Sequence, residues 1–431
     1  MNGRPRHSVV RERLDSVRGD SAAASAQGRR HRPDYWLLIL AALLMAIGLV
    51  VVYSISPGLA ASQGVSQNYY ITKQLIDVGL GIVTFAAAAY LPTSWWWRAA
   101  VPLAWMAAVG CLIVMVTPVN AVYEAHRWIR LGSFSFQIAE FIKVALLVWV
   151  AKFLTEQWRA GRLADAKATL RPLVIILLAV GIIVAKLQSD LGSAGVMIAM
   201  MGLMAFTVGI PLKKVLLIGG IVLLLVTVAI GSTSYRRERL TAFLHPQTHC
   251  QGNGYQACQA LISVGSGGLF GLGLGNSVQA YGYTPEASND SIFAIIAEQV
   301  GFIGSLIIIT IYGFFISRLK QIIERTSDQF SRLVVVGVLA WLSTQMIINI
   351  GAMIGLLPLK GITLPLISQG GTSLIFLTAA LGIVFQISRY TCYSVIEPKS
   401  TASEKEHAYY SINGRGIRRP HHAATVTGPR S

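Results

Sequence analysis

The sequence predicts an all-α polytopic membrane protein with about ten transmembrane helices and a long extracytoplasmic loop between the seventh and eighth spans. Hydrophobic residues make up 54% of the 431 residues and charged residues only 13%, a composition that excludes a soluble globular domain with a polar surface. The apolar residues fall in stretches of roughly 20, the length that crosses a bilayer as a helix.

Ten such stretches follow one another along the chain. They cover residues 35–55, 73–91, 96–117, 138–156, 171–188, 192–210, 213–232, 291–316, 332–357 and 371–390. Residues 1–34 have no apolar region of their own, so they are predicted to be a basic cytoplasmic tail and not a cleaved signal peptide. The membrane domain is predicted over 35–395, and the polar residues 396–431 are expected to form a second cytoplasmic tail. Both tails are expected to be disordered.

The distribution of Lys and Arg predicts the orientation. Of the 36 basic residues, 27 fall in the two tails and in connections on the same side, chiefly 152–171 and 317–332. The positive-inside rule places that side in the cytoplasm, and two cytoplasmic termini require an even number of spans. The net charge of +17 is therefore attributed to loops facing an anionic leaflet and not to nucleic-acid binding.

Four regions are predicted on the external side, where they could converge into one cleft. They are the long loop 233–290, residues 118–137 with HRWIRLGSFSFQ, the QSDLG turn at 188–192, and 358–370 with PLKGITLPLISQG. A loop as long as the first is usually functional in a compact protein. Its glycine cluster, SVGSGGLFGLGLGN, lacks the GK[ST] ending of a phosphate loop, so it predicts close backbone packing and not nucleotide binding.

Asp290 is the first candidate for chemistry. It lies where the polar loop meets the first apolar turns of the eighth span. A carboxylate at the hydrocarbon boundary loses hydration, and membrane proteins rarely accept that cost without a functional reason.

Six motifs carry a resemblance to a known family. In chain order they are HRWIRLGSFSFQIAEFIK, QSDLGSA, YRRERLTAFL, GYQACQALISVGSGGLFGLGLGNSVQ, PEASNDSIFAIIAEQVGFIG and GLLPLKGITLPLISQGGTSL. They resemble, over about residues 35–390, the SEDS family, which comprises FtsW, RodA and their sporulation homologue. GLGNSVQ, the PEA before Asp290, and LKGITLPLIS are more similar to FtsW, the cell-division branch, than to RodA.

The resemblance implies a peptidoglycan glycosyltransferase. Such an enzyme would polymerise lipid II into glycan strands at the outer face of the cytoplasmic membrane during cell division, by an inverting displacement that releases undecaprenyl diphosphate. Asp290 matches the family's essential carboxylate, with an inferred role as general base on the acceptor hydroxyl. The resemblance also implies a class B penicillin-binding protein (a transpeptidase) and other divisome proteins as partners, and a location at the division septum.

A departing diphosphate needs positive charge, and the external side offers several candidates. Arg127, Lys186 and Arg237 are the preferred diphosphate contacts, with Lys360 as a further one; each could instead be an interfacial residue that extends its charge to the membrane surface. A divalent cation (Mg²⁺ or Mn²⁺) could assist, although no resident cofactor or protein metal site is expected.

Three further side chains are assigned to substrate binding. Asn276 and Gln279 of the glycine-rich loop are candidates for sugar hydroxyls. Glu298 lies eight residues after Asp290 and therefore on roughly the same helix face, where it could support the site or serve helix packing.

Other residues leave alternatives open. Glu140 and Lys143, three apart on the fourth span, could form an ion pair or line a substrate cavity. Asp190 could cap the sixth span, and Asp77 has no evident partner. Cys250 and Cys258 in the external loop could form a disulfide.

Two rival functions are compatible with the same sequence. A lipid II flippase would also use ten spans and embedded charges, although its key charges should lie near the midplane. A noncatalytic divisome scaffold would not need Asp290.

The residues around Asp290 depart from the family pattern. Asp290 is flanked by Ser288, Asn289 and Ser291 where the family usually has His, Thr and Phe, and Gln369 replaces a usual Tyr. These differences bear on acceptor recognition more than on the type of reaction.

Overall fold

The structure is a computed structural model that describes residues 32–116, 128–131, 134–188, 190–231, 243, 250–252 and 254–390. The chain divides into two units, Met1–Cys392 and Tyr393–Ser431, and all described residues belong to the first. Nearly all of both predicted tails, and the predicted site residues Arg127 and Arg237, lie outside the described residues.

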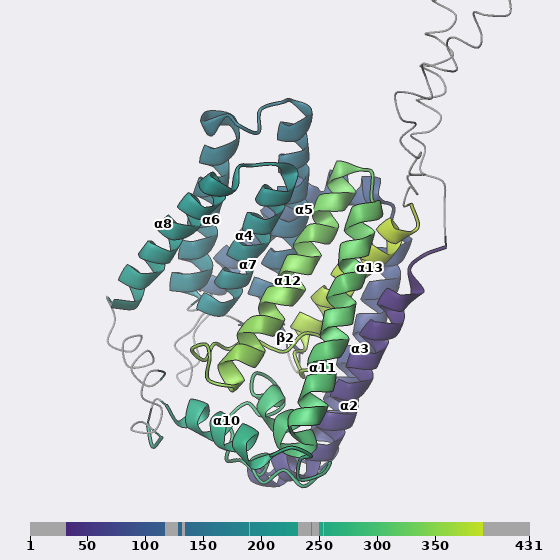
Figure 1. Cartoon of the computed structure of the whole chain (residues 1–431), viewed down its shortest axis with the longest axis vertical. Coiled ribbons are helices and arrows are strands. Elements are labelled where there is room, and N and C mark those ends of the chain that lie inside the picture. Colours follow the sequence, from purple (N-terminus) through teal and green to yellow (C-terminus); the bar gives the residue numbers. More distant parts are fainter. Residues whose placement is uncertain are drawn as a thin grey trace, which may run out of the picture. The chain divides into compact units, whose positions relative to one another are not determined.

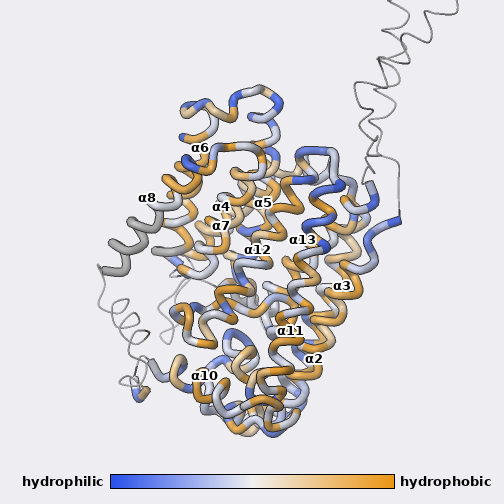
Figure 2. The backbone as a smooth tube through the Cα atoms, viewed as in Figure 1, coloured by the Kyte–Doolittle hydropathy of each residue, from blue (hydrophilic) through white to orange (hydrophobic). Residues whose placement is uncertain are grey.

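Each of the ten predicted stretches is helical. The helices are α2 (Tyr35–Gln63), α3 (Tyr69–Tyr90), α4 (Thr93–Val116), α5 (Ile138–Arg159), α6 (Arg171–Val180), α7 (Leu191–Val208), α8 (Leu212–Gly231), α11 (Ile292–Arg325), α12 (Gln329–Met353) and α13 (Thr372–Ser388). Among the described residues, seven helices are long and apolar enough to cross a membrane. Figure 2 shows hydrophobic residues along the helices and hydrophilic ones concentrated in connections at one end of the bundle.

Helix ends follow ordinary capping chemistry. The Asp34 carboxylate accepts from the backbone N–H groups of Trp36 and Leu37 and starts α2, and Gly64, with φ of 66°, ends it. Such caps satisfy backbone groups that a helix end leaves unpaired. Asp328 caps α12 in the same way by accepting from the Ser331 N–H.

Three local structures are absent from the sequence-based prediction. The HRWIRLGSFSFQ region contains an antiparallel hairpin of β1 (Trp128–Leu131) and β2 (Phe134–Gln137), with Trp128 opposite Gln137. The predicted fifth span, 171–188, is not one uniform α-helix, because α6 continues into the π-helical segment η2 (Gly181–Leu187); a second π-helical segment, η1 (Ala166–Leu170), precedes α6. The third structure is α10 (Tyr255–Ser266) in the long loop; it lies across the end of the bundle opposite the α5–α6 connection (Figure 1).

The core is built from closely packed helix pairs. α3 packs along α13, α7 along α12, and α4 along α5. At Gly382 of α13 a Cβ atom would collide with the Phe85 carbonyl oxygen of α3, so glycine allows these two backbones to approach. The largest fully buried side chains include Trp341, Tyr312 and Phe293.

The glycine-rich loop is bonded onto a break in α11. Gly301 interrupts the helix with φ of 66° and ψ of −167°, a conformation essentially restricted to glycine. Leu272 N–H donates to the Glu298 carbonyl (2.9 Å) and Phe302 N–H donates to the Gly268 carbonyl (2.9 Å). The sequence-based prediction of close glycine packing is thereby confirmed.

Gly271 provides a test of this packing. Its φ is 82°, and an added Cβ would overlap the Gln299 backbone, so Gly271→Ala is expected to cost about 3 kcal/mol of stability from strain and overpacking together. Gly268 is the matched control, because its φ is also positive (53°) but a Cβ there would meet open space. Thermal melting in detergent should show a clearly larger fall in melting temperature for Gly271→Ala than for Gly268→Ala. Equal melting temperatures would contradict the close contact between Gly271 and the Gln299 backbone.

Candidate functional site

Asp290 lies in a tightly closed loop just before α11. The Glu286 carbonyl accepts from the N–H groups of Asn289 (3.0 Å) and Ser291 (3.1 Å), and the Ser291 hydroxyl donates to the Pro285 carbonyl (2.9 Å). Asp290 is half-buried. We call residues 285–291 the Asp290 loop.

A second segment, residues 357–371 between α12 and α13, holds the Asp290 loop in place. The Gln369 N–H donates to the Ser288 carbonyl (3.0 Å), and the Ser368 hydroxyl donates to the Asn289 carbonyl (2.7 Å). The side-chain amide of Asn349, from α12, donates to the carbonyl of Asp290 itself (2.7 Å). Three consecutive carbonyls are thus fixed by donors that lie far away in the sequence.

Both segments carry backbone strain. In the described part of the chain only two non-glycine residues have positive φ, Glu286 (53°) and Leu366 (65°). One belongs to the Asp290 loop and the other to segment 357–371. Strained conformations of this kind persist where surrounding structure imposes them, and they concentrate at functional sites.

The disulfide that was one possibility from the sequence is present, and it lies on a helix that contacts the Asp290 loop. Cys250 and Cys258 are bonded, with their Cα atoms 5.4 Å apart. Cys258 lies on α10, and from the same helix the Gln256 amide donates to the hydroxyl of Ser291 (3.1 Å), the residue after Asp290. A cross-linked helix therefore rests on the Asp290 loop.

Glu298 occupies the interior beneath the glycine-rich loop. It is 1% exposed, and its carboxylate accepts from the hydroxyls of Ser263 (3.2 Å) and Ser277 (2.5 Å) and from the N–H groups of Val278 (3.1 Å) and Gln279 (3.4 Å). Four donors on one buried carboxylate tie α10, the loop and α11 together. This geometry favours the packing alternative for Glu298.

The two predicted sugar-binding residues differ in their surroundings. Gln279 is buried, and its side-chain oxygen accepts from the Thr284 hydroxyl (3.1 Å). Asn276 is exposed, and its amide donates to the Leu272 carbonyl (3.0 Å). Asn276 is thus the more accessible of the two.

The predicted cations are located only in part. Lys360 is half-buried in segment 357–371, the segment that holds the Asp290 loop. Lys186 lies in η2, where the structure describes the backbone only. Within the described residues no three His, Cys, Asp or Glu side chains gather to hold a metal ion.

The four predicted external regions are joined to one another. The Gln137 amide, from the hairpin region, donates to Asp190 of QSDLG (3.3 Å), and the Gln137 N–H donates to the Thr372 hydroxyl at the start of α13 (3.4 Å). Gly192 at the start of α7 has room for no Cβ because Ile362 of segment 357–371 lies against it. Since segment 357–371 also holds the Asp290 loop, contacts connect the described parts of all four regions. That these regions form one cleft stays a prediction.

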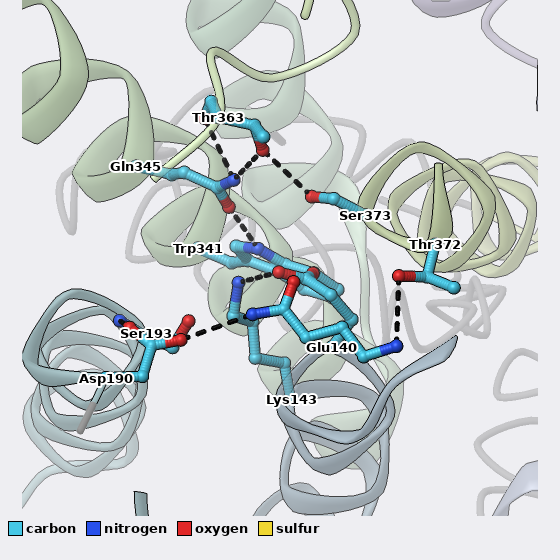
Figure 3. A network of polar contacts seen from close by, with 10 residues as sticks. Glu140, Lys143, Asp190, Ser193, Trp341, Gln345, Thr363, Thr372 and Ser373 are labelled. Atoms are coloured by element: carbon cyan, nitrogen blue, oxygen red, sulfur yellow. Dashed lines mark hydrogen bonds and ion pairs between the residues drawn. The ribbon is translucent and has the colours of Figure 1, made fainter. Parts of the chain in front are cut away.

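A buried polar network continues from these contacts into the bundle (Figure 3). Glu140 and Lys143 form an ion pair of 2.7 Å with side chains 5% and 1% exposed, and the Lys143 ammonium lies 5.3 Å from the centre of the Trp341 ring. Pairing was one of two alternatives for these charges, and it is confirmed. Asp190 accepts from the Ser193 N–H (2.9 Å), which confirms it as the cap of α7.

Asp77 is buried on α3 and lies beside Gly371 at the start of α13, where an added Cβ would be 3.9 Å from the Asp77 Oδ2 atom. This neighbour is nearly 300 residues later in the chain, and no sequence pattern indicated it. The contact adds to the packing of α3 against α13.

An apolar cavity of about 390 Å³ lies elsewhere, between α4, α5 and the α6–η2 helix. Its lining includes Trp105, Cys111, Trp149 and Val184 and none of the predicted site residues. The chemical candidates therefore remain those around Asp290.

Comparison with known proteins gives the same family as the six sequence motifs. The family model described as "Cell cycle protein", FtsW/RodA/SpoVE, matches residues 35–393. A protein of Saccharophagus degradans named "Probable peptidoglycan glycosyltransferase FtsW" is 37% identical, over 84% of this chain and 94% of its own. Stage V sporulation protein E of Bacillus subtilis is 34% identical, over 85% of this chain and 99% of its own.

Solved structures show the same fold. A chain from a peptidoglycan synthase complex that coordinates polymerization and crosslinking superposes with a TM-score of 0.67 at 26% identity, covering 83% of this chain and 98% of that one. The rod shape determining protein RodA of Thermus thermophilus gives a TM-score of 0.60 at 26% identity, covering 84% and 98%. The chain therefore belongs to the FtsW/RodA/SpoVE family of multi-pass membrane proteins.

Proposed function

We propose that this chain is a peptidoglycan glycosyltransferase that polymerises lipid II at the outer face of the cytoplasmic membrane during cell division. The observation that carries the proposal is Asp290, half-buried in a strained loop that α10, α12 and segment 357–371 fix from three sides. The activity for which the FtsW relative is named, peptidoglycan glycosyltransferase, supports the same proposal.

In the proposed reaction, Asp290 accepts the proton of the acceptor sugar hydroxyl. The hydroxyl oxygen then bonds to the anomeric carbon of the donor, while the bond from that carbon to the phosphate oxygen breaks and its electrons leave with undecaprenyl diphosphate. One displacement converts an α-linked donor into a β-linked product. A rigid loop serves this chemistry because general-base catalysis needs the base within hydrogen-bond distance of its proton.

Charge stabilisation of the leaving diphosphate is assigned to basic side chains. Lys360 is the described candidate, since it lies in the segment that holds the Asp290 loop. Arg127, Arg237 and Lys186 remain proposals from the sequence, because their side chains lie outside the part that the structure describes.

The orientation is proposed from two agreeing arguments. Basic connections gather at the end of the bundle where α5 leads to α6, and the disulfide lies in the long loop before α11. Disulfides persist in oxidising compartments, so we place the Asp290 loop outside and both termini in the cytoplasm. A position at the division septum follows from the cell-division function.

The assay that tests the function uses the purified full chain with fluorescent lipid II, alone and with a class B penicillin-binding protein. Formation of glycan strands that a muramidase digests supports the proposal. Transbilayer movement of lipid II in sealed vesicles without any glycan product would instead favour a flippase. Neither activity in a folded, partnered protein would favour a scaffold.

A docking surface for the class B penicillin-binding protein is proposed on α11. Phe302, Leu306 and Ile307 are 62%, 50% and 56% exposed on successive turns, and such an apolar face suits either lipid or a partner's single spanning helix. A photo-crosslinking residue at Phe302 is expected to label the transpeptidase, whereas one at Trp105 of α4, which is 70% exposed, is expected to label lipid only. Labelling from Trp105 but not Phe302 would move the surface elsewhere. Other divisome proteins are further expected partners.

A further inference from the structure

Asn349 joins the Asp290 loop to segment 357–371 through one side-chain amide. It lies on α12 and is 1% exposed. Its Nδ2 donates to the carbonyl of Asp290 (2.7 Å) and to the carbonyl of Ile362 (2.7 Å). Both amide hydrogens are thus used, one on each of the two segments that meet at the candidate site.

The acceptor half of the same amide indicates why an asparagine is present. Asn349 Oδ1 is buried and accepts no hydrogen bond from the described residues. An unpaired buried acceptor lowers stability, so an apolar residue would serve simple packing as well or better. What only the amide supplies is a pair of donors, and these donors fix two backbone carbonyls.

We propose that Asn349 is a positioning residue for glycosyl transfer. Its hydrogen bonds to the backbone of Asp290 and of segment 357–371 set the direction of the Asp290 carboxylate. This inference rests on the proposed role of Asp290 as base. Ser368 and Gln369 hold the two preceding carbonyls, but Asn349 holds the residue that carries the carboxylate. A displacement of about 1 Å at a reacting group can cost about 100-fold in rate.

Gln345 provides a matched control on the same helix. It lies one turn before Asn349 and is also 1% exposed. Its amide nitrogen donates to the Thr363 carbonyl (3.1 Å) and hydroxyl (3.2 Å), and its oxygen accepts from Trp341 (2.6 Å). Gln345 therefore holds the same segment, but its described hydrogen bonds do not reach the Asp290 loop.

The experiment compares Asn349→Leu, Asn349→Asp and Gln345→Leu in the full chain. Leu removes the amide, and Asp keeps its shape while leaving at most one O–H donor for the two carbonyls. Asn349→Leu is expected to melt close to Gln345→Leu, and Asn349→Asp to melt lower because it buries a carboxyl group against two carbonyls. Both Asn349 variants are expected to keep the KM for lipid II within about threefold and to lose about 100-fold in kcat. Gln345→Leu is expected to keep kcat within about threefold of wild type.

Several results would overturn the inference. They are wild-type kcat in a folded Asn349 variant, an equal loss of kcat in Gln345→Leu, and unfolding of both Asn349 variants, which would make the residue merely structural. Asp290→Asn in the same assay separates the two proposals. If that variant stays active, the role of Asp290 fails; if it is inactive while Asn349→Leu is active, only the positioning role fails.

Discussion

Asp290→Asn is expected to reduce glycan-strand formation by about 1,000-fold while leaving the protein folded. Asparagine keeps the size of the side chain but cannot accept the proton of the acceptor hydroxyl, and loss of a general base typically costs about 100- to 10,000-fold. The backbone contacts of Asp290 do not depend on its carboxylate, because Asn349 bonds the carbonyl.

Asp290→Glu gives a graded comparison. The carboxylate is retained but is displaced by one methylene, so a loss of about 100-fold from misplacement is expected. The order of rates should therefore be wild type, then Glu, then Asn, measured as initial rates of glycan formation from labelled lipid II.

Asp34→Asn is the control for the substitution itself. Asp34 caps α2 far from the Asp290 loop in the sequence, and asparagine caps helices as well as aspartate does. Its polymerisation rate should equal that of wild type. A comparable loss in both variants would attribute the effect of Asp290→Asn to general damage.

The second large effect is expected from Lys143→Met. Lys143 and Glu140 are paired at 2.7 Å and almost fully buried, so removal of the ammonium leaves a buried carboxylate without its counter-charge. Breaking a buried pair in this way costs about 3–5 kcal/mol. The melting temperature of the purified protein should fall accordingly.

The double variant Glu140→Gln with Lys143→Met tests the cause. It removes both charges, so most of the stability lost in Lys143→Met should return, because a neutral pair costs far less to bury. Glu140→Gln alone should also destabilise, since it leaves the lysine charged. Wild-type melting of Lys143→Met would contradict the account of the ion pair.

The helices and the local contacts were predictable from the sequence for a physical reason. Spanning segments follow from apolar length, and short-range pairs follow from helix geometry; the Glu140–Lys143 pair and the Asp190 cap are both three residues apart. The glycine cluster likewise indicated close backbone approach, which Gly271 and Gly301 confirm.

The arrangement around Asp290 could not be predicted in the same way. Asn349 and Ser368 are 59 and 79 residues from the carbonyls that they bind. Ser368 lies in one of the family motifs, but the motif does not indicate its partner, and Asn349 lies in none of the motifs. The break at Gly301 depends on backbone contacts with the glycine-rich loop, some 30 residues earlier. The β1–β2 hairpin, in contrast, had a local signal that the prediction missed, since two strand-like runs, WIRL and FSFQ, are separated by Gly-Ser. Glu298 was assigned to the substrate from its helix face, but that argument could not include the four donors that bury its carboxylate.

The most direct test of the central claim measures binding and bond formation on the same sample of Asp290→Asn. Lipid II affinity should equal that of wild type, because the basic residues and loops that would hold the substrate are unchanged, whereas labelled glycan should not accumulate. Wild-type rates of glycan formation by the folded Asp290→Asn protein would contradict the claim that this carboxylate is the base.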